Sequence, residues 1–214
     1  MPLFVNEIFH SIQGESINNG RPCVFIRLTG CNLRCAYCDT RYAYDEGKTL
    51  ELSEIMDEIA AYQCPLVEIT GGEPLLQEGT PGMIYRLIEN GYDVMMETNG
   101  SLDIRRVDER CMKIVDVKCP SSKMSEKNDL ENLKRLNPKD QLKFVVGNRE
   151  DYEFAKNIIH SQPYAISTSH ILFSPVLGVM PPDRLAKWIL EDHLNVRLNL
   201  QLHKIIWPLE QRGV

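Results

Sequence analysis

The sequence predicts an α/β fold in which parallel strands alternate with helices, as either an open doubly wound sheet or a partial barrel. Short apolar segments that fit strands recur between segments with a helical spacing of apolar residues. Cys31, Gly71 and Asn99 each follow a predicted strand closely. Because ligands collect at the carboxyl ends of parallel strands, we expect these three positions to border one site.

The predicted strands are short apolar segments, and several end at turn residues. Gly71-Gly72 ends one strand, and Thr98-Asn99-Gly100 ends the next. The expected strands cover residues 3–9, 23–29, 66–70, 93–97, 113–117, 141–146, 170–173 and 196–202.

Helices are expected between these strands, where apolar residues recur every three or four positions. Leu52, Ile55 and Ile59 share one face of the first helix, and Gly91 ends the second. The Asn148 side chain can cap the fourth helix by accepting from an unpaired amide of its first turn. The first expected helix starts at residue 52, the second covers 83–90, and the third lies near 130–136. The fourth runs from 149 to 160, and the fifth lies near 184–193. Residues 119–129 are expected to form a loop.

Length and composition place the chain among globular proteins that can bury a full core. Its 214 residues fit a single domain over 1–214. The net charge of −6 argues against binding nucleic acid through phosphate contacts. No apolar run approaches the roughly 20 residues that span a bilayer, and the start of the chain lacks the features of a signal peptide. We therefore expect a cytoplasmic protein without a nucleic-acid or membrane partner.

Three cysteines, Cys31, Cys35 and Cys38, form a C-x3-C-x2-C pattern. Clustered cysteines in a cytosolic protein favour metal or redox chemistry over disulfides. Thiolates bind zinc or iron–sulfur clusters, and 4Fe–4S clusters usually take four cysteines, so three would leave one iron open. A structural zinc site is the alternative interpretation. The remaining cysteines are isolated, and we expect them to pack in the core: Cys23, Cys64, Cys111 and Cys119.

The turn Gly71-Gly72-Glu73-Pro74 follows the strand predicted at 66–70. Two glycines let a ligand approach the backbone, and Glu73 offers a carboxylate to an ammonium group. Such a turn alone is more often only a turn. Together with the cysteine pattern, and with Tyr37 just before the last cysteine, it resembles the radical SAM superfamily. The resemblance implies a 4Fe–4S cluster whose open iron binds S-adenosylmethionine.

Longer segments resemble one family of that superfamily, the 7-carboxy-7-deazaguanine synthases. They are residues 9–16 (FHSIQGES), 25–31 (FIRLTGC) and 38–40 (CDT), and the resemblance extends to 201–204 and 212–214. It implies a lyase that converts 6-carboxy-5,6,7,8-tetrahydropterin to 7-carboxy-7-deazaguanine with loss of ammonia, in queuosine biosynthesis. It also implies an abbreviated parallel β/α barrel, a Mg²⁺ ion, a homodimer and a flavodoxin- or ferredoxin-like electron donor.

The same resemblance assigns site residues by their positions. The residues implied to bind metal are Cys31, Cys35, Cys38 and Thr40. Those implied to contact the cofactor are Tyr37, Cys38, Asp39, Gly71, Gly72, Glu73, Asn99, Lys118, Ser121, Ser174 and Pro175. Those implied to contact the substrate are Ile12, Gln13, Gly14, Glu15, Arg27, Thr70 and His203.

Several of these residues suit their implied roles chemically, and each also has a plainer interpretation. Arg27, in the apolar segment VFIRL, can bind a carboxylate through two hydrogen bonds or can face outward. Glu15 can accept two N–H groups of a pterin or lie solvated in a loop. Thr40 can bind Mg²⁺ beside the substrate carboxylate, with Asp39 as a competitor, or can cap a turn. A lone histidine such as His203 is more often a surface or internally bonded residue.

Two other functions stay open on the sequence. A glycyl-radical activating enzyme shares the cysteine spacing but needs a groove for a protein loop. A zinc-binding interaction module would use the cysteines for folding rather than catalysis. Some relatives also finish at a proline whose chain end helps hold the substrate, whereas this chain continues past Pro208 to Val214.

Overall fold

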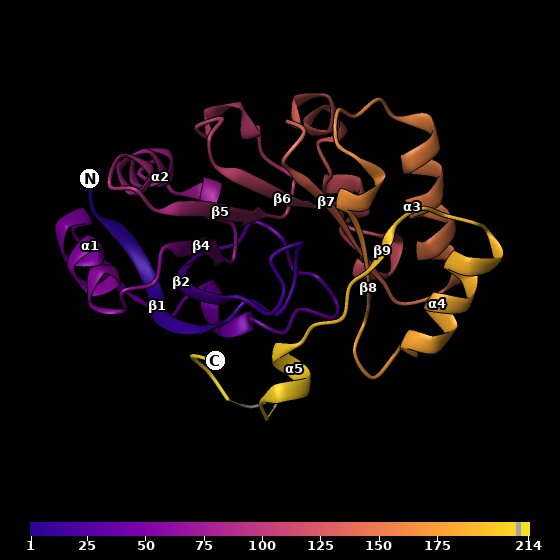
Figure 1. Ribbon diagram of the computed structural model, residues 1–214, viewed down its shortest axis with the longest axis horizontal. Helices are drawn as coiled ribbons and strands as arrows, with labels where there is room; N and C mark the ends of the chain where they lie inside the picture. Colours follow the sequence, from indigo (N-terminus) through magenta and orange to yellow (C-terminus); the bar gives the residue numbers. More distant parts are fainter. Residues whose placement is uncertain (209–210) are drawn as a thin grey trace.

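The backbone forms one curved sheet that does not close, with helices along its outer side (Figure 1). The computed structural model describes residues 1–208 and 211–214. The strands are β1 (Leu3–Ile12), β2 (Pro22–Leu28), β3 (Lys48–Leu50), β4 (Leu66–Gly71), β5 (Asp93–Thr98), β6 (Met112–Asp116), β7 (Gln141–Val146), β8 (Ile171–Pro175) and β9 (Arg197–Leu198). The α-helices are α1 (Leu52–Ala61), α2 (Thr80–Glu89), α3 (Arg149–Ser161), α4 (Pro182–Glu191) and α5 (His203–Ile206).

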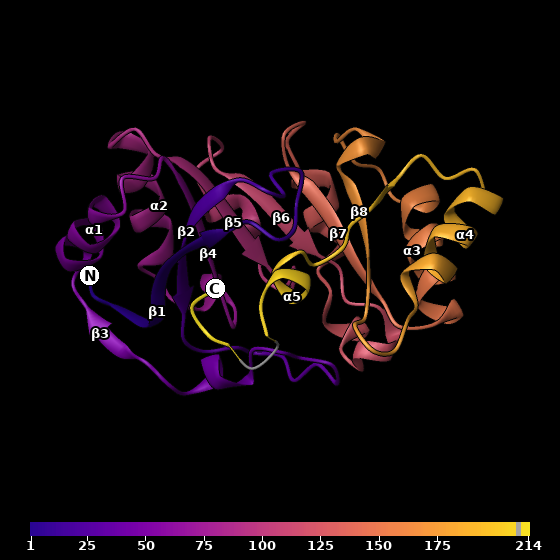
Figure 2. The same ribbon diagram turned by 60° about the horizontal axis from the view of Figure 1, so that its bottom comes forward.

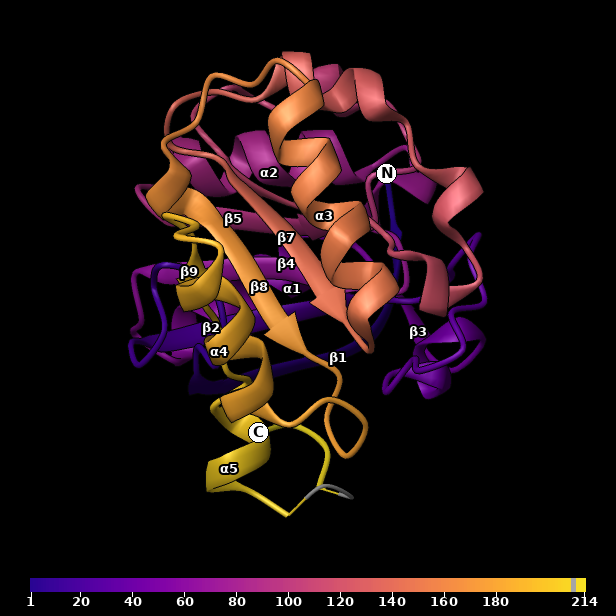
Figure 3. The same cartoon turned by 90° about the vertical axis from the view of Figure 1, so that its right-hand side faces the viewer.

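The sheet has the order β3-β1-β2-β4-β5-β6-β7-β8-β9. Every neighbouring pair from β2 to β9 is parallel. Figure 3 shows β7 and β8 running in the same direction beside α3. An open, mostly parallel sheet with helices outside is a partial β/α barrel, which confirms the predicted fold class.

The first two strands depart from the expected parallel pattern, because β1 pairs antiparallel with both β2 and β3. Residues 13–21 join β1 to β2, and they are too few for a parallel crossover, which needs about a dozen residues. A backbone hydrogen bond joins the two ends of this connection, since Gly20 N donates to Gln13 O at 2.8 Å. β1 and β2 therefore form a hairpin at one edge of the barrel.

Other differences from the predicted elements have local causes. Residues 130–135 form a 3-10 helix rather than an α-helix, because buried Asn132 bonds the backbone of Gly100 and Leu102 and ties the segment to that loop. The strand predicted at 196–202 is paired only over β9, because the chain then leaves the sheet and Leu202 N bonds Gly14 O. β3 and α5 have no counterpart among the elements expected from the sequence.

The core lies between the sheet and its outer helices. Val24, Ile26 and Leu28 of β2 are fully buried on that outer face, whereas Phe25 and Arg27 between them face the inner side. α1 buries Ile55 and Ile59, as its apolar spacing predicts. The predicted cap is confirmed, because Asn148 Oδ1 accepts from Asp151 N at 3.0 Å. The four isolated cysteines are buried, as expected of packing residues.

The C-terminal segment, meaning residues 199–208 and 211–214, crosses the inner side of the sheet, opposite α1 and α2 (Figures 1 and 2). No helix in the described parts of the chain is both long and apolar enough to cross a membrane. Loops and the C-terminal segment, rather than a second layer of long helices, cover the inner side.

Because Ile26 is fully buried, we expect Ile26→Ala to lower the free energy of unfolding by about 2–5 kcal/mol through lost burial and a new cavity. The matched control is Ile205→Ala, where the isoleucine is 65% exposed and the change should stay within about 0.5 kcal/mol. Denaturant unfolding followed by circular dichroism measures both. Equal destabilisation by the two substitutions would contradict this assignment of the core.

Candidate active site

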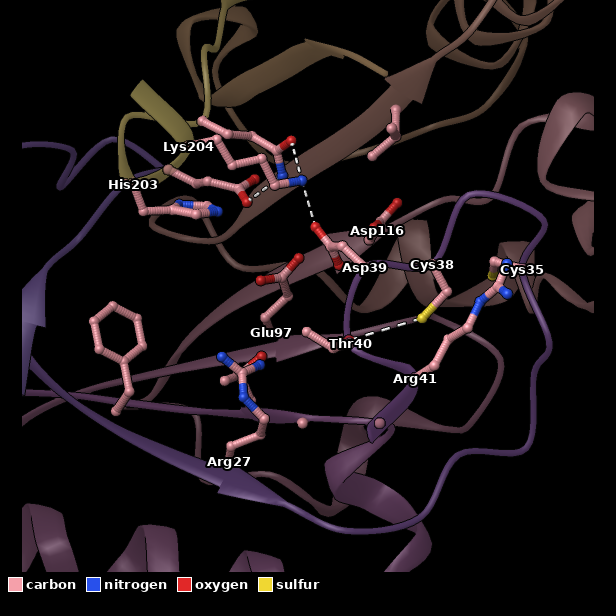
Figure 4. Close-up of a pocket in the computed structure, with 18 of the residues that line it drawn as sticks. Arg27, Cys35, Cys38, Asp39, Thr40, Arg41, Glu97, Asp116, His203 and Lys204 are labelled. Atoms are coloured by element: carbon pink, nitrogen blue, oxygen red, sulfur yellow. Dashed lines mark hydrogen bonds and ion pairs between the residues drawn. The ribbon is translucent and has the colours of Figure 1, made fainter. Parts of the chain in front are cut away.

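A cavity of about 870 Å³ opens on the inner side of the sheet. Its walls come from the carboxyl ends of β2, β4, β5 and β6, from the loop after β2, and from the C-terminal segment. Cavities of this size accommodate cofactors and small substrates. Figure 4 shows Arg27, Thr40, Glu97, His203 and Lys204 arranged around it.

The three clustered cysteines lie together on the cavity wall, as the sequence predicted. Cys31, Cys35 and Cys38 are free and only partly buried. The loop that carries them is held in shape, because Cys38 N bonds Cys35 O at 3.2 Å and Arg34 bonds Cys31 O at 2.7 Å. Three accessible thiols on one short loop that lines the cavity are the donor type that an iron–sulfur cluster takes. In the described part of the chain these side chains are not already gathered into a group that could hold a metal ion.

The glycine turn after β4 packs directly against this cysteine loop. A Cβ atom at Gly72 would clash with the carbonyl of Gly30 and with Cys31. Glu73 N also donates to Gly30 O at 2.8 Å. Only glycine allows this approach, so the turn and the cysteine loop form one continuous wall.

The Glu73 carboxylate does not line the cavity, although the sequence pattern suggested an ammonium contact. It is fully buried and accepts from Leu75 N at 3.0 Å, Thr98 Oγ1 at 2.9 Å and Asn99 N at 2.7 Å. These bonds fix the end of β5, where the Asn99 side chain lies 3.9 Å from Cys31 Sγ. Glu73 thus positions its neighbours around the cavity.

Ionisable side chains from neighbouring strands meet on the inner face of the sheet. Lys143 Nζ of β7 pairs with Glu15 and lies 2.8 Å from Glu97 Oε1 of β5. Burial alone would raise the pKa of Glu15, but the Lys143 ammonium lowers it to about 2. Burial, together with Glu97 and Glu15, raises the pKa of Glu68 on β4 well above its usual range. Glu15 is therefore an ionised acceptor, while Glu68 favours its protonated form.

Arg27 reaches the cavity, so the outward-facing interpretation is wrong. Its Nε donates to Glu7 Oε1 at 2.7 Å, and its guanidinium lies 5.7 Å from the centre of the Phe9 ring. Thr70 is its register partner on β4 and also lines the cavity. Thr40 Oγ1 lies 3.8 Å from Cys38 Sγ and makes no capping bond to the turn that follows, so the turn-cap interpretation of its side chain is not supported.

The C-terminal segment closes one side of the cavity. Lys204 Nζ pairs with Asp39 and bonds Gln201 Oε1 at 2.7 Å, while Gln201 Nε2 donates to Glu15 Oε1 at 2.8 Å. His203 packs so closely on Gly14 that a Cβ atom there would clash with it. Burial lowers the pKa of His203, which favours the neutral imidazole.

Most of the residues implied by the sequence line this one cavity. They are Ile12, Gln13, Gly14, Glu15, Arg27, Cys31, Cys35, Tyr37, Cys38, Asp39, Thr40, Thr70, Gly71, Gly72, Asn99, Lys118 and His203. Ser121, Ser174 and Pro175 are not among the lining residues. Ser121 bonds Asp151 through its amide and its hydroxyl, and Ser174 Oγ accepts from Asn199 Nδ2 at 3.0 Å.

Several charged residues of the cavity are not among those implied by the sequence. Glu68, Glu97, Asp116 and Lys143 lie within strands or at their ends, and all four line it. A charged residue inside an apolar strand was the feature that drew attention to Arg27. The same feature at Glu68 and Lys143 could have identified two of these residues.

Comparisons with known proteins agree with this geometry. Residues 25–125 match the model of the radical SAM superfamily. The 7-carboxy-7-deazaguanine synthase of Koribacter versatilis (strain Ellin345) is 44% identical, with 98% of this chain and 99% of the relative aligned. The enzyme of the same name from Chlorobaculum tepidum is 45% identical, with 100% and 98% aligned.

A solved structure shares the fold. The crystal structure of QueE from Escherichia coli superposes with a TM-score of 0.79 over 94% of each chain, at 24% sequence identity. The full-length relatives favour neither a zinc-binding module nor a glycyl-radical activating enzyme. The chain belongs to the 7-carboxy-7-deazaguanine synthase family of the radical SAM superfamily.

Proposed function

We propose that this protein is a lyase that converts 6-carboxy-5,6,7,8-tetrahydropterin to 7-carboxy-7-deazaguanine, a step of 7-deazapurine and queuosine biosynthesis. The observation that carries the proposal is one cavity lined by three thiols, by the Arg27 guanidinium and by Glu15, whose pKa is lowered beside Lys143. The conversion is redox-neutral, because 7-carboxy-7-deazaguanine and one ammonia together contain all the atoms of the substrate.

The cofactor side of the cavity is the wall made by the cysteine loop and the glycine turn. Cys31, Cys35 and Cys38 would hold a 4Fe–4S cluster, and S-adenosylmethionine would lie beside it. When bound, the two supply the chemistry that abstracts a hydrogen atom. The chain's part is to orient them and to limit access of water. Residues that would border S-adenosylmethionine are Tyr37, Asp39, Gly71, Gly72, Asn99 and Lys118.

The substrate side is the wall made by the β1–β2 hairpin and the C-terminal segment. Arg27 would bind the substrate carboxylate with its free amino groups, and Thr40 would contribute a hydroxyl ligand to Mg²⁺ at the same carboxylate. Glu15 is held ionised by Lys143, so it would accept N–H groups of the pterin ring. Thr70 and His203 would complete this wall.

The family resemblance also suggests partners, which we propose on that basis alone. The enzyme would act as a homodimer in the cytoplasm, as one radical SAM domain over residues 1–214. A flavodoxin- or ferredoxin-like protein would deliver the electron that the cluster needs. Light scattering and a comparison of reductants would test these two proposals.

The proposed function is tested by anaerobic reconstitution of the cluster, followed by incubation with S-adenosylmethionine, Mg²⁺, a chemical reductant and the carboxytetrahydropterin. We expect 7-carboxy-7-deazaguanine and an equal amount of ammonia, with no net consumption of S-adenosylmethionine. Mass spectrometry and an ammonia assay measure the outcome. If the enzyme cleaves S-adenosylmethionine but yields no deazaguanine, the assignment of this substrate is wrong. The assignment to the radical SAM superfamily would still hold.

Cys35→Ala should abolish both the visible absorbance of the reconstituted cluster and product formation, because a cluster corner loses its thiolate. Cys64→Ala is the matched control, since Cys64 is buried away from the cavity. It should keep the absorbance and most of the activity. Loss of the absorbance in the control, or its retention in Cys35→Ala, would contradict the ligand assignment.

Arg27→Ala should weaken binding of the carboxytetrahydropterin by at least roughly tenfold, because charge-assisted hydrogen bonds to the carboxylate are lost. The affinity for S-adenosylmethionine should change little. Arg105→Ala, at an exposed arginine remote from the cavity, provides the control. Equal losses of substrate and cofactor affinity in Arg27→Ala would count against a carboxylate contact.

A further inference from the structure

Glu7 lies behind Arg27 and outside the cavity wall, where neither the resemblance nor the cavity assigns it a role. Its Oε1 atom accepts from Arg27 Nε at 2.7 Å and from the Tyr42 hydroxyl at 3.1 Å. The Glu7 and Arg27 side chains are 18% and 14% exposed. A partly desolvated, charge-assisted bond of this kind holds its partner more firmly than a surface ion pair does.

A bulge in β1 places Glu7 there. The register pairs Val5 with Leu28 and then Glu7 with Arg27, so Asn6 is one extra residue in β1. Before the bulge, Val5 faces the buried core together with Leu28. After it, Glu7 lies on the inner face beside Arg27. One inserted residue reverses the alternation of a strand, which is how bulges redirect side chains next to active sites.

The ring of Tyr42 supports the same arrangement. Burial raises the pKa of Tyr42 to about 12, so its hydroxyl keeps the proton that it donates to Glu7. The ring lies 5.8 Å from the Arg27 guanidinium and 3.9 Å from that of Arg212. The Tyr42 hydroxyl is therefore a second donor that holds the Glu7 carboxylate in place. Glu7 is restrained in the side-chain conformation that bonds Arg27.

A guanidinium can grip a planar carboxylate through either of two edges, and the bond to Glu7 removes one of them. With Nε engaged, the remaining edge is the pair of terminal amino groups. Within the described residues, neither terminal amino group of Arg27 has a hydrogen-bond partner. Figure 4 shows Arg27 reaching into the cavity on the side of Thr40 and Glu97.

We propose that Glu7 is a positioning residue that takes Arg27 Nε and so presents the two terminal amino groups end-on to the substrate carboxylate. The inference rests on the proposed function, because it needs a carboxylated substrate at Arg27. It makes Glu7 a determinant of specificity for the carboxylate, not for the pterin ring. Its negative charge opposes binding of an anion, whereas its bond to Arg27 Nε orients the guanidinium toward that anion.

Three substitutions separate the geometric role from a role of charge. Glu7→Ala removes the acceptor, and Glu7→Asp withdraws it by one methylene while keeping the charge. Both should weaken binding of the carboxytetrahydropterin roughly tenfold. Glu7→Gln removes the charge but keeps an acceptor oxygen at the same reach, so it should retain binding within about threefold. A role of charge predicts the reverse order for Asp and Gln.

The readouts are binding isotherms for three ligands on the cluster-loaded enzyme: the carboxytetrahydropterin, the same ring without its carboxylate, and S-adenosylmethionine. Only the first should respond to Glu7→Ala, and the double variant with Arg27→Ala should bind no more weakly than Arg27→Ala alone. Glu153→Ala, at an exposed ion-paired glutamate of α3, is the control and should change none of the three.

Three results would overturn the proposal: unchanged or tighter binding in Glu7→Ala and Glu7→Asp, equal weakening for the pterin with and without its carboxylate, or a further loss in the double variant. Each of these leaves the proposed function standing if the parent enzyme still makes deazaguanine. A parent enzyme that does not bind the carboxytetrahydropterin would instead contradict both. If Glu7→Ala does not fold, the Asp and Gln variants decide the matter.

Discussion

The inner face of the sheet holds ionisable side chains on five neighbouring strands, and the need to satisfy each of them by an ion pair, a hydrogen bond or a proton is the constraint on which the site depends. Arg27, Glu68, Glu97, Asp116 and Lys143 come from β2, β4, β5, β6 and β7. Isolated charges at such depth are unstable, whereas paired and hydrogen-bonded ones are tolerated. Lys143 is central, because it pairs with carboxylates from both the hairpin and β5. Most apolar packing lies on the outer face, whereas the inner face carries these polar groups beside a few apolar side chains such as Phe9 and Phe25.

The C-terminal segment extends this network across the cavity. Gln201 bonds Glu15, Lys204 pairs with Asp39 beside the last clustered cysteine, and Arg212 bonds Glu46 at 2.8 Å. The same short stretch of chain thus touches the substrate side and the cysteine loop. Side-chain hydrogen bonds and ion pairs, rather than a shared apolar core, therefore link the substrate side of the cavity to the wall made by the cysteine loop.

The sequence could predict those parts of the site that local pattern encodes. The cysteine loop and the glycine turn have distinctive spacing, and each follows a strand whose end faces the cavity. The placement of Glu73 could not be foreseen, because its three donors come from its own turn and from the end of β5. Likewise, Lys143 shows its role only when Glu15 and Glu97 are brought beside it. The 3-10 helix at 130–135 also depends on a tertiary contact, through Asn132. Local propensity therefore accounted for most strands and helices but not for the polar network.

The hairpin of β1 and β2 explains why the two sides of the cavity differ. A standard strand–helix unit would contribute only its carboxyl end, as β4 and β5 do. The antiparallel hairpin contributes a long face instead, with Phe9 stacked on Phe25 at 5.0 Å and the 13–15 loop reaching the C-terminal segment. The bulge at Asn6 is what turns this face inward at Glu7, because an unbroken alternation from Val5 would have sent Glu7 into the core. A buried glutamate without a partner would be costly there, whereas opposite Arg27 it is satisfied. The bulge at Asn6 and the charged Arg27 within an apolar strand therefore belong to one arrangement. The bulge brings Glu7 to Arg27, and Arg27 gives the inward-facing Glu7 its partner.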